Sequence, residues 1–166
     1  MTTISVIVGS TRQGRFSEKP AQWILQQLQK RDGIEARLLD LRDFPMPFFD
    51  QPMPPAMPGR APYEHEIVKR WTAAIAASDG FVFVTPEYNY GTSAVLKNAI
   101  DWVYPEWNRK AAASVSYGSA HGRARDPAAP RNHDRGSDRP GALVRPHPRR
   151  DSLGAFPGRR CGKRAR

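Results

Sequence analysis

The chain has 166 residues, of which 39% are hydrophobic and 25% are charged, and it carries a formal net charge of +10 at pH 7. This length suits one domain, and the single cysteine, Cys161, excludes an internal disulfide. No apolar stretch approaches the roughly 20 residues that a membrane-spanning helix needs, and the amino terminus lacks the layout of a signal peptide. We therefore expect a cytoplasmic protein without membrane contact. The spacing of the four histidines with carboxylates and cysteine predicts no metal site.

The first predicted strand, residues 4–8, leads through a loop into a helix with apolar positions from Ala21 to Leu28. The loop holds two glycines, three hydroxyl side chains and two arginines: Gly9, Gly14, Ser10, Thr11, Ser17, Arg12 and Arg15. Glycines allow backbone conformations closed to other residues, and a helix amino terminus favours anions. The loop therefore indicates a phosphate site, and a tight turn with Ser17 as a helix cap is the alternative. Its spacing matches neither the dinucleotide fingerprint nor the nucleotide-triphosphate loop.

Alternating elements continue along the chain. A second strand is predicted over 35–41, and seven prolines make 45–62 a long loop. The methionines and phenylalanines of this loop suit an apolar contact surface, or burial against the domain itself. A helix is predicted from about Tyr63, and its apolar face consists of Ile67, Trp71, Ala74, Ile75 and Ser78.

The stretch 80–91 is the most informative part of the sequence. Its unbroken Phe/Val run indicates a strand covered on both faces, as in a parallel sheet, and such sheets bind ligands at the carboxyl ends of their strands. Residues Pro86 to Gly91 follow as a polar, aromatic tip, for which an ordinary strand-to-helix loop is the alternative. Thr92 and Ser93 then open an apolar helix, and 111–117 is the fourth predicted strand, ending in a turn at Gly118.

The combination of these motifs resembles the NADPH-dependent FMN reductase family, a flavodoxin-like group that includes quinone, azo-dye and chromate reductases. The resemblance covers residues 1 to about 119 and is carried by Gly9–Ser17, Asp40–Pro47, Pro86–Tyr90 and Leu96–Trp102. It implies bound FMN, with NADPH or NADH as electron donor and a small-molecule acceptor. It also implies a homodimer or homotetramer. FMN carries the chemistry, so no catalytic side chain is expected.

The resemblance also implies positions for the flavin. The FMN phosphate is expected near Ser10, Arg12, Phe16 and Ser17. Pro86, Glu87, Tyr88 and Asn89 are expected to line the isoalloxazine ring, and the turn at Gly118 to approach it. Arg12 and Arg15 could bind either the FMN phosphate or the extra phosphate of NADPH. The alternative role of Glu87 is a solvated or helix-capping charge.

The chain after residue 120 has a different composition. Residues 1–120 carry a net charge of +1 and residues 121–166 one of +9, with 12 arginines and one lysine. This tail is interpreted as a basic arm, as a disordered tail without function, or as an out-of-frame reading of a GC-rich gene, which we favour. A basic arm would attract nucleic acid only non-specifically.

The expected fold is an α/β, flavodoxin-like, doubly wound parallel sheet with three αβα layers. The domain covers 1–120, and the tail 121–166 does not supply a proper fifth strand and last helix. The expected function is an FMN-dependent NAD(P)H oxidoreductase acting on quinones, azo compounds, chromate or free flavin. The alternative is an inactive flavodoxin-like remnant, or a non-enzymatic binding module acting through its basic tail.

Overall fold

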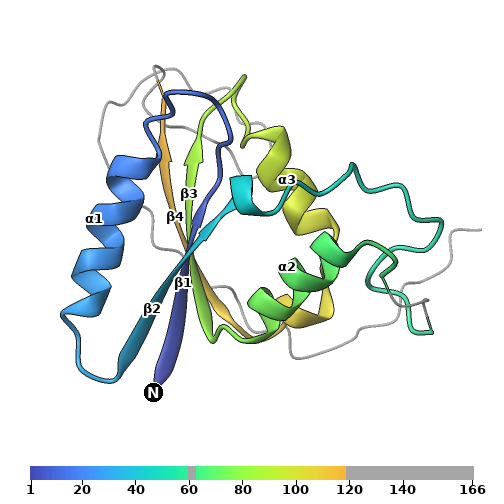
Figure 1. Ribbon diagram of the computed structural model, residues 1–166, viewed down its shortest axis with the longest axis horizontal. Coiled ribbons are helices and arrows are strands. Elements are labelled where there is room, and N and C mark those ends of the chain that lie inside the picture. Colours follow the sequence, from blue (N-terminus) through green and yellow to red (C-terminus); the bar gives the residue numbers. More distant parts are fainter. Residues whose placement is uncertain (60–62, 119–166) are drawn as a thin grey trace, which may run out of the picture.

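The computed structural model describes residues 1–59 and 63–118. In these residues strands and helices alternate along the chain (Figure 1). The strands are β1 (Thr2–Val8), β2 (Ile34–Asp40), β3 (Gly80–Pro86) and β4 (Ala111–Tyr117). The helices are α1 (Glu18–Gln29), α2 (Glu66–Ala76) and α3 (Ala94–Asp101), with short 3-10 turns η1 (Leu41–Asp43) and η2 (Pro105–Trp107). The expected α/β alternation is confirmed.

The four strands form one parallel sheet in the order β2-β1-β3-β4. This order matches the first four strands of the flavodoxin-like sheet. The register places Val8 opposite Asp40 on one side and Val84 on the other, and it places Pro86 opposite Tyr117. The carboxyl ends of the strands, and the loops that follow them, therefore share one edge of the sheet.

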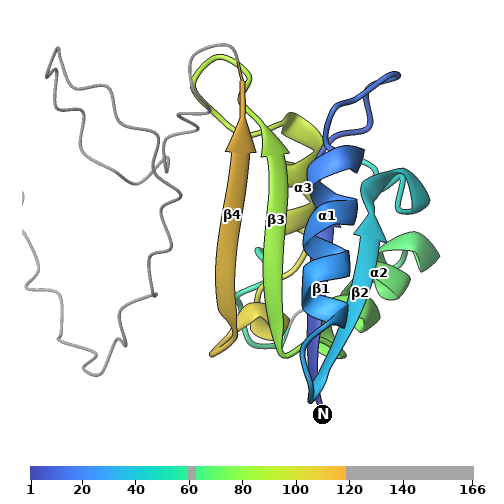
Figure 2. The ribbon, with the colours of Figure 1, turned by 90° about the vertical axis from the view of Figure 1, so that its left-hand side faces the viewer.

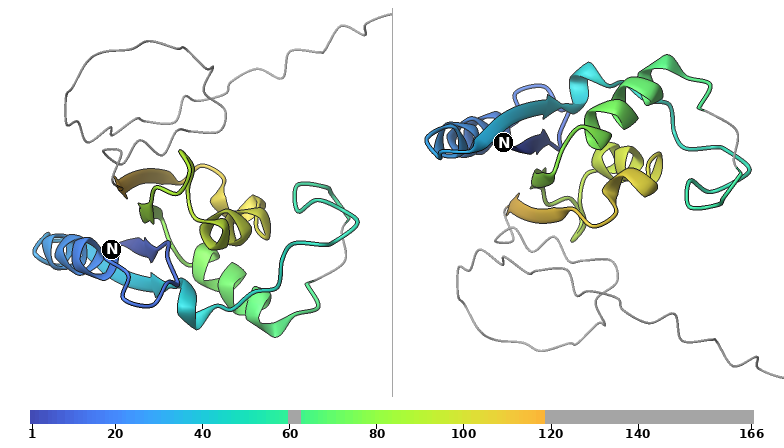
Figure 3. Two further views of the ribbon diagram at one scale, coloured as in Figure 1. Left: turned by 90° about the horizontal axis from the view of Figure 1, so that it is seen from above. Right: turned by 90° about the horizontal axis from the view of Figure 1, so that it is seen from below.

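Helices lie on both faces of the sheet, as the views from the side and along the strands show (Figures 2 and 3). Helix α1 covers one face, where it packs on Val6 and Val8 of β1 and Val84 of β3. Helices α2 and α3 cover the other, where Trp71 and Trp102 are the largest buried side chains. The expected three-layer arrangement is confirmed, and none of the described helices is long and apolar enough to cross a membrane.

Strand β4 lies at the edge of the described sheet, and no described helix lies in front of it on the α1 face (Figure 2). Val115, on this strand, remains 36% exposed. The prediction that a proper fifth strand and last helix are lacking concerns residues 119–166, which lie outside the described residues. The boundary between domain and tail likewise stays a prediction.

The proline-rich segment after η1 forms the predicted long loop, described up to residue 59. The carbonyl of Pro47 accepts hydrogen bonds from Asn98 Nδ2 and Trp102 Nε1, both at 2.8 Å, and the Phe49 amide donates to Asn98 Oδ1 at 2.9 Å. Two polar groups of α3 and its end thus hold the loop against the domain. Helix α2 begins at Glu66, three residues later than predicted, because His65 has the extended backbone of an N-cap.

Candidate functional site

The loop between β1 and α1 is fixed at its start by Gly9. Its amide donates to the Val84 carbonyl at 2.8 Å, and its carbonyl accepts a hydrogen bond from Ser93 Oγ. A Cβ atom at Gly9 would lie 2.9 Å from both the Val84 oxygen and Leu96 Cδ2. The loop can therefore begin here only with a glycine, since β3 and α3 leave no room for a side chain.

Ser17 occupies the N-cap position of α1, but its side chain does not cap the helix. Its backbone is already helical, with φ −55° and ψ −24°, and its hydroxyl accepts no hydrogen bond from the helix amides. The residue is fully buried, and its Oγ has no partner among the described residues. The capping alternative for this loop is therefore wrong. A buried hydroxyl without a partner costs free energy unless a further group meets it.

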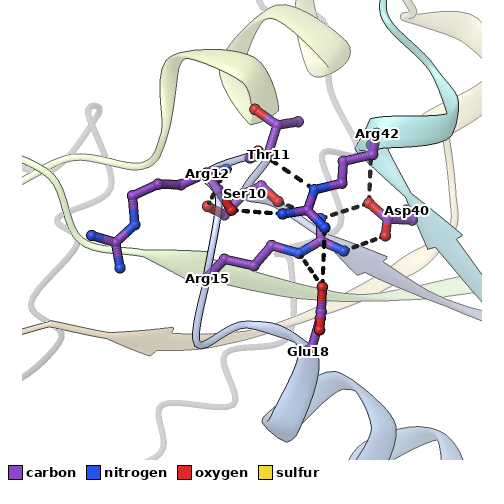
Figure 4. A network of polar contacts seen from close by, with 7 residues as sticks. All are labelled: Ser10, Thr11, Arg12, Arg15, Glu18, Asp40 and Arg42. Atoms are coloured by element: carbon purple, nitrogen blue, oxygen red, sulfur yellow. Dashed lines mark hydrogen bonds and ion pairs between the residues drawn. The ribbon is translucent and has the colours of Figure 1, made fainter.

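The two arginines of the loop differ in what they contact (Figure 4). The side chain of Arg15 is 3% exposed and forms a two-pronged ion pair with Asp40, with Nη1 to Oδ1 at 2.7 Å. Its Nε also donates to Glu18 Oε1 at 3.0 Å. Arg12 is exposed, points away from this network and forms no side-chain hydrogen bond or ion pair with the described residues. Of the two, only Arg12 remains available to an anionic ligand.

Sequence reasoning did not assign the partners of Arg15. Asp40 ends β2, where its carboxylate also accepts the Arg42 amide at 2.9 Å and so begins η1. This hydrogen bond explains why β2 ends one residue before the predicted boundary. Glu18, in the first turn of α1, forms ion pairs with both Arg15 and Arg42. The only sequence signal for this cluster was Asp40, at the start of the stretch Asp40–Pro47.

The ion pair with Arg15 predicts how stability depends on acid. Burial acts to raise the pKa of Asp40, but hydrogen bonds from Arg15 and from the Arg42 amide outweigh it, so the pKa lies below its usual value. The resulting stabilisation is present above about pH 4 and is lost as the pH falls through the lowered value. We expect Asp40→Asn to lower the melting temperature at pH 7, and we expect this difference from the parent to shrink as the pH falls below about 4, measured by circular dichroism.

Asp43→Asn is the matched control, because Asp43 is an exposed carboxylate in the same turn. It should melt at nearly the parent's temperature at both pH values. A melting difference between Asp40→Asn and the parent that persists unchanged near pH 3 would contradict the assignment.

The loop after β3 ends in a tight turn over Tyr88–Gly91. The Tyr88 amide donates to the Gly91 carbonyl at 2.9 Å, and the Gly91 amide donates back at 3.0 Å. Asn89 and Tyr90 both have positive φ, 51° and 65°, as a two-residue type I′ turn requires. Such values are uncommon for tyrosine, and strained backbone of this kind gathers at ligand sites. The turn presents Tyr90, 69% exposed, at the edge of the sheet.

The loops after β1, β3 and β4 meet at one place. The ring of Phe16 packs edge-on against Tyr117 at 5.1 Å, and the Glu87 amide donates to the Tyr117 carbonyl at 2.7 Å. Gly118 follows directly, where a Cβ atom would lie 2.8 Å from Glu87 Cβ. One carboxylate oxygen of Glu87 is buried without a partner among the described residues. Glu87 is therefore not the fully solvated charge of the alternative interpretation.

The residues predicted for a site thus lie on one edge of the sheet. Ser10, Arg12, Phe16 and Ser17 follow β1; Pro86 ends β3 and is followed by Glu87, Tyr88 and Asn89; and Gly118 follows β4. The structure brings the ends of these loops into contact through Phe16, Glu87 and Tyr117. Arg12 and Asn89 extend from the edge without side-chain partners among the described residues.

A separate cavity of about 430 Å³ lies beside the first loop, toward β2. Its walls are mostly apolar and come from the first loop, η1, the proline-rich loop and α3: Thr11, Leu41, Arg42, Phe44, Pro45, Met46, Phe48, Val95 and Asn98. Several apolar residues of the proline-rich loop therefore face their own domain. Within the described residues no group of three or more His, Cys, Asp or Glu could hold a metal ion.

Comparisons with known proteins identify the family of this chain. The model of a family described as NADPH-dependent FMN reductase matches residues 2–133. An NAD(P)H-dependent FMN reductase from a Nectria species is 40% identical over 125 residues, which cover 74% of this chain and 62% of that protein. An NAD(P)H:quinone oxidoreductase from Solanum tuberosum is 31% identical over 126 residues, covering 74% of this chain and 61% of the other.

A solved structure is similar as well. The flavoenzyme NAD(P)H:(acceptor) oxidoreductase FerB from Paracoccus denitrificans aligns with a TM-score of 0.52 and 32% identity, covering 71% of this chain and 60% of that one. This chain therefore spans about three fifths of the length of the relatives it matches.

Proposed function

The chain belongs to the NADPH-dependent FMN reductase family. We propose that it binds FMN at the carboxyl edge of β1, β3 and β4 and that it acts as an NAD(P)H-dependent oxidoreductase. The observation that carries the proposal is the buried Ser17 hydroxyl, which has no partner among the described residues and lies in the loop that also presents Arg12. A buried donor without a partner and an exposed arginine in one loop are groups that can bind a phosphate.

The first loop fits the phosphate of FMN. Ser17 Oγ, the amino end of α1 and the free guanidinium of Arg12 supply a hydroxyl donor, a favourable helix dipole and a positive charge. The amides of Thr11 and Gln13 also have no hydrogen-bond partner among the described residues. Arg15 is left out of this set, since Asp40 and Glu18 already engage it.

The other two loops fit the isoalloxazine ring. Gly118 allows the end of β4 to approach Glu87 closely, since a Cβ atom there would lie 2.8 Å from Glu87 Cβ. The turn at Asn89 and Tyr90 is closed by the two backbone hydrogen bonds between Tyr88 and Gly91. Thr85 Oγ1 lies 2.5 Å from Thr92 Oγ1, which ties the two ends of this loop together. A fixed loop of this kind would orient a flat ring and shield one side of it from water.

FMN, when bound, accepts a hydride equivalent from NAD(P)H and passes electrons to an acceptor. The residues of this chain bind and orient the cofactor, and no described side chain is assigned a covalent step. As acceptor we propose a quinone, which the name of the Solanum tuberosum relative supports. Side-by-side steady-state rates with a quinone, an azo dye, chromate and free FMN test this choice, and a higher kcat/KM with another acceptor would contradict it.

The proposal includes a homo-oligomer. Three aromatic side chains near this edge are exposed: Phe48, Tyr88 and Tyr90. Phe48 lies on the loop that follows β2 and η1, and the two tyrosines lie on the loop that follows β3. Exposed aromatic groups near a ligand site are typical of surfaces that contact a partner. Sedimentation velocity over a range of concentrations should give a mass of two or four chains, and a monomer at all concentrations would contradict it.

Ser17→Ala tests the proposed phosphate site with two measurements of opposite sign. Removing the hydroxyl should weaken FMN binding by about 1.5–3 kcal/mol, since one hydrogen bond to a charged group is lost. The free energy of unfolding of the flavin-free protein should stay equal or rise, because a buried hydroxyl without a partner is removed. Fluorescence titration with FMN and urea unfolding measure the two effects.

Ser114→Ala is the matched control, because Ser114 is a serine in β4 away from the first loop. It should leave FMN affinity unchanged. A Ser17→Ala protein that unfolds more easily yet binds FMN like the parent would show that the hydroxyl is structural.

A further inference from the structure

Three successive carbonyl groups of the first loop accept hydrogen bonds from two arginine side chains (Figure 4). One is Arg15, near the end of the same loop, and the other is Arg42, in η1. The Ser10 carbonyl accepts from Arg15 Nη1 at 2.5 Å, and the Arg12 carbonyl accepts from Arg42 Nη2 at 2.7 Å. Between them the Thr11 carbonyl accepts from Arg42 Nε at 3.5 Å, a weaker contact. The carbonyls of residues 10–12 are therefore all turned toward guanidinium groups.

This arrangement decides where the loop's amides point. In a trans peptide the carbonyl and the amide N–H point in opposite directions, and the described residues contain no cis peptide. With the carbonyls of residues 10–12 turned to the arginines, the amides of Thr11 and Gln13 face the other way and have no partner among the described residues. The Arg12 amide between them donates to Ser10 Oγ at 3.4 Å. The Thr11 and Gln13 amides therefore remain for a ligand, and amides that face one way form an anion-binding concavity.

The arginines are themselves held by two carboxylates. Asp40 pairs with Arg15 through both of its oxygens, and Glu18 Oε1 accepts from Arg15 Nε at 3.0 Å and from Arg42 Nη1 at 3.2 Å. Arg15 is almost fully buried, so its conformation is set by these partners. Asp40 therefore connects the end of β2, through Arg15, to the loop after β1.

We infer that Arg15, fixed by Asp40, is a positioning residue that presets the first loop for the phosphate of the flavin, although neither side chain contacts that phosphate. The inference rests on the proposed function. It assigns the loop's affinity for phosphate to backbone orientation imposed from β2, and it gives Arg12 alone the role of a direct arginine contact.

Asp40→Asn separates this inference from simple charge attraction, because the two predict opposite signs. The substitution removes a negative charge near the phosphate site, so attraction alone would tighten FMN binding. Positioning predicts that FMN binds about tenfold more weakly. Arg15 would lose one of its two hydrogen bonds to residue 40, and its hydrogen bond to the Ser10 carbonyl would be less well held. Riboflavin, which lacks the phosphate, should change by less than about twofold.

Arg15→Lys is the second variant. Lysine keeps the positive charge but lacks the planar fork that reaches both Ser10 and Asp40. FMN affinity should fall as it does in Asp40→Asn, so charge alone does not rescue binding. The control is Glu35→Gln, which removes a carboxylate of the same strand that pairs with Arg37 at the surface. It should bind FMN and riboflavin like the parent.

A readout without flavin keeps the inference separate from the proposed function. In the free protein, backbone ¹⁵N NMR should show the amides of residues 11–17 shifted in Asp40→Asn and in Arg15→Lys, but not in Glu35→Gln. If the parent fails to bind FMN, the proposed function is contradicted, whereas an unshifted loop contradicts the positioning role. Tighter or unchanged FMN binding by folded Asp40→Asn also overturns the inference.

Discussion

Trp71→Ala is expected to lower the free energy of unfolding by about 3–5 kcal/mol. The indole is fully buried on the α2 and α3 face of the sheet, where it contacts the rings of Phe44 and Trp107. Its Nε1 donates to the Ala99 carbonyl at 2.8 Å, so truncation leaves both a cavity and an unsatisfied carbonyl. Domains are stable by only about 5–15 kcal/mol, and this loss is therefore a large part of the total.

Denaturant unfolding followed by far-UV circular dichroism measures the effect of Trp71→Ala without relying on tryptophan fluorescence. Trp23→Ala is the matched control, since Trp23 is 62% exposed on α1. It should change the free energy of unfolding by less than about 0.5 kcal/mol. Equal losses in the two variants would contradict the assignment of Trp71 to the core.

Arg12→Ala is expected to weaken FMN binding by about 1–3 kcal/mol, the range for losing a charge-assisted hydrogen bond. The guanidinium is exposed and has no partner among the described residues, so its removal should leave the free energy of unfolding nearly unchanged. Titration with FMN and with riboflavin by flavin fluorescence gives the measurement. Riboflavin should bind Arg12→Ala as it binds the parent, because it carries no phosphate.

Arg31→Ala is the control for Arg12→Ala, because it removes an exposed arginine beyond the far end of α1. Its FMN affinity should equal that of the parent. Should Arg12→Ala retain the parent's FMN affinity, the phosphate would have to bind elsewhere.

The strands and their loops were predictable from the sequence because each strand is a short apolar run bounded by turn residues. Strand β4 occupies the predicted residues 111–117, and β1 and β3 contain their predicted apolar runs. The position of the site at the carboxyl ends follows from parallel pairing alone. Its residues came from the family resemblance, and their contacts with a flavin stay predictions.

The roles of individual residues were less predictable because they depend on partners far along the chain. Sequence treats Arg12 and Arg15 alike, and only the fold brings Asp40 to Arg15. Gly9 and Gly14 were both expected to permit backbone conformations closed to other residues, and Gly14 has a positive φ of 63°. Gly9 is required instead for close approach to β3 and α3. The hydroxyl of Ser17 likewise reads as a cap until its helical backbone is known.

We propose that this chain, although it spans about three fifths of its relatives' length, holds FMN in a working site. The most direct test is the visible absorption spectrum of the purified full chain with FMN, followed by NADPH without oxygen. We predict a shifted, bound-flavin spectrum that bleaches when NADPH is added. A folded chain that leaves FMN free in solution, or holds it without bleaching, would contradict the claim.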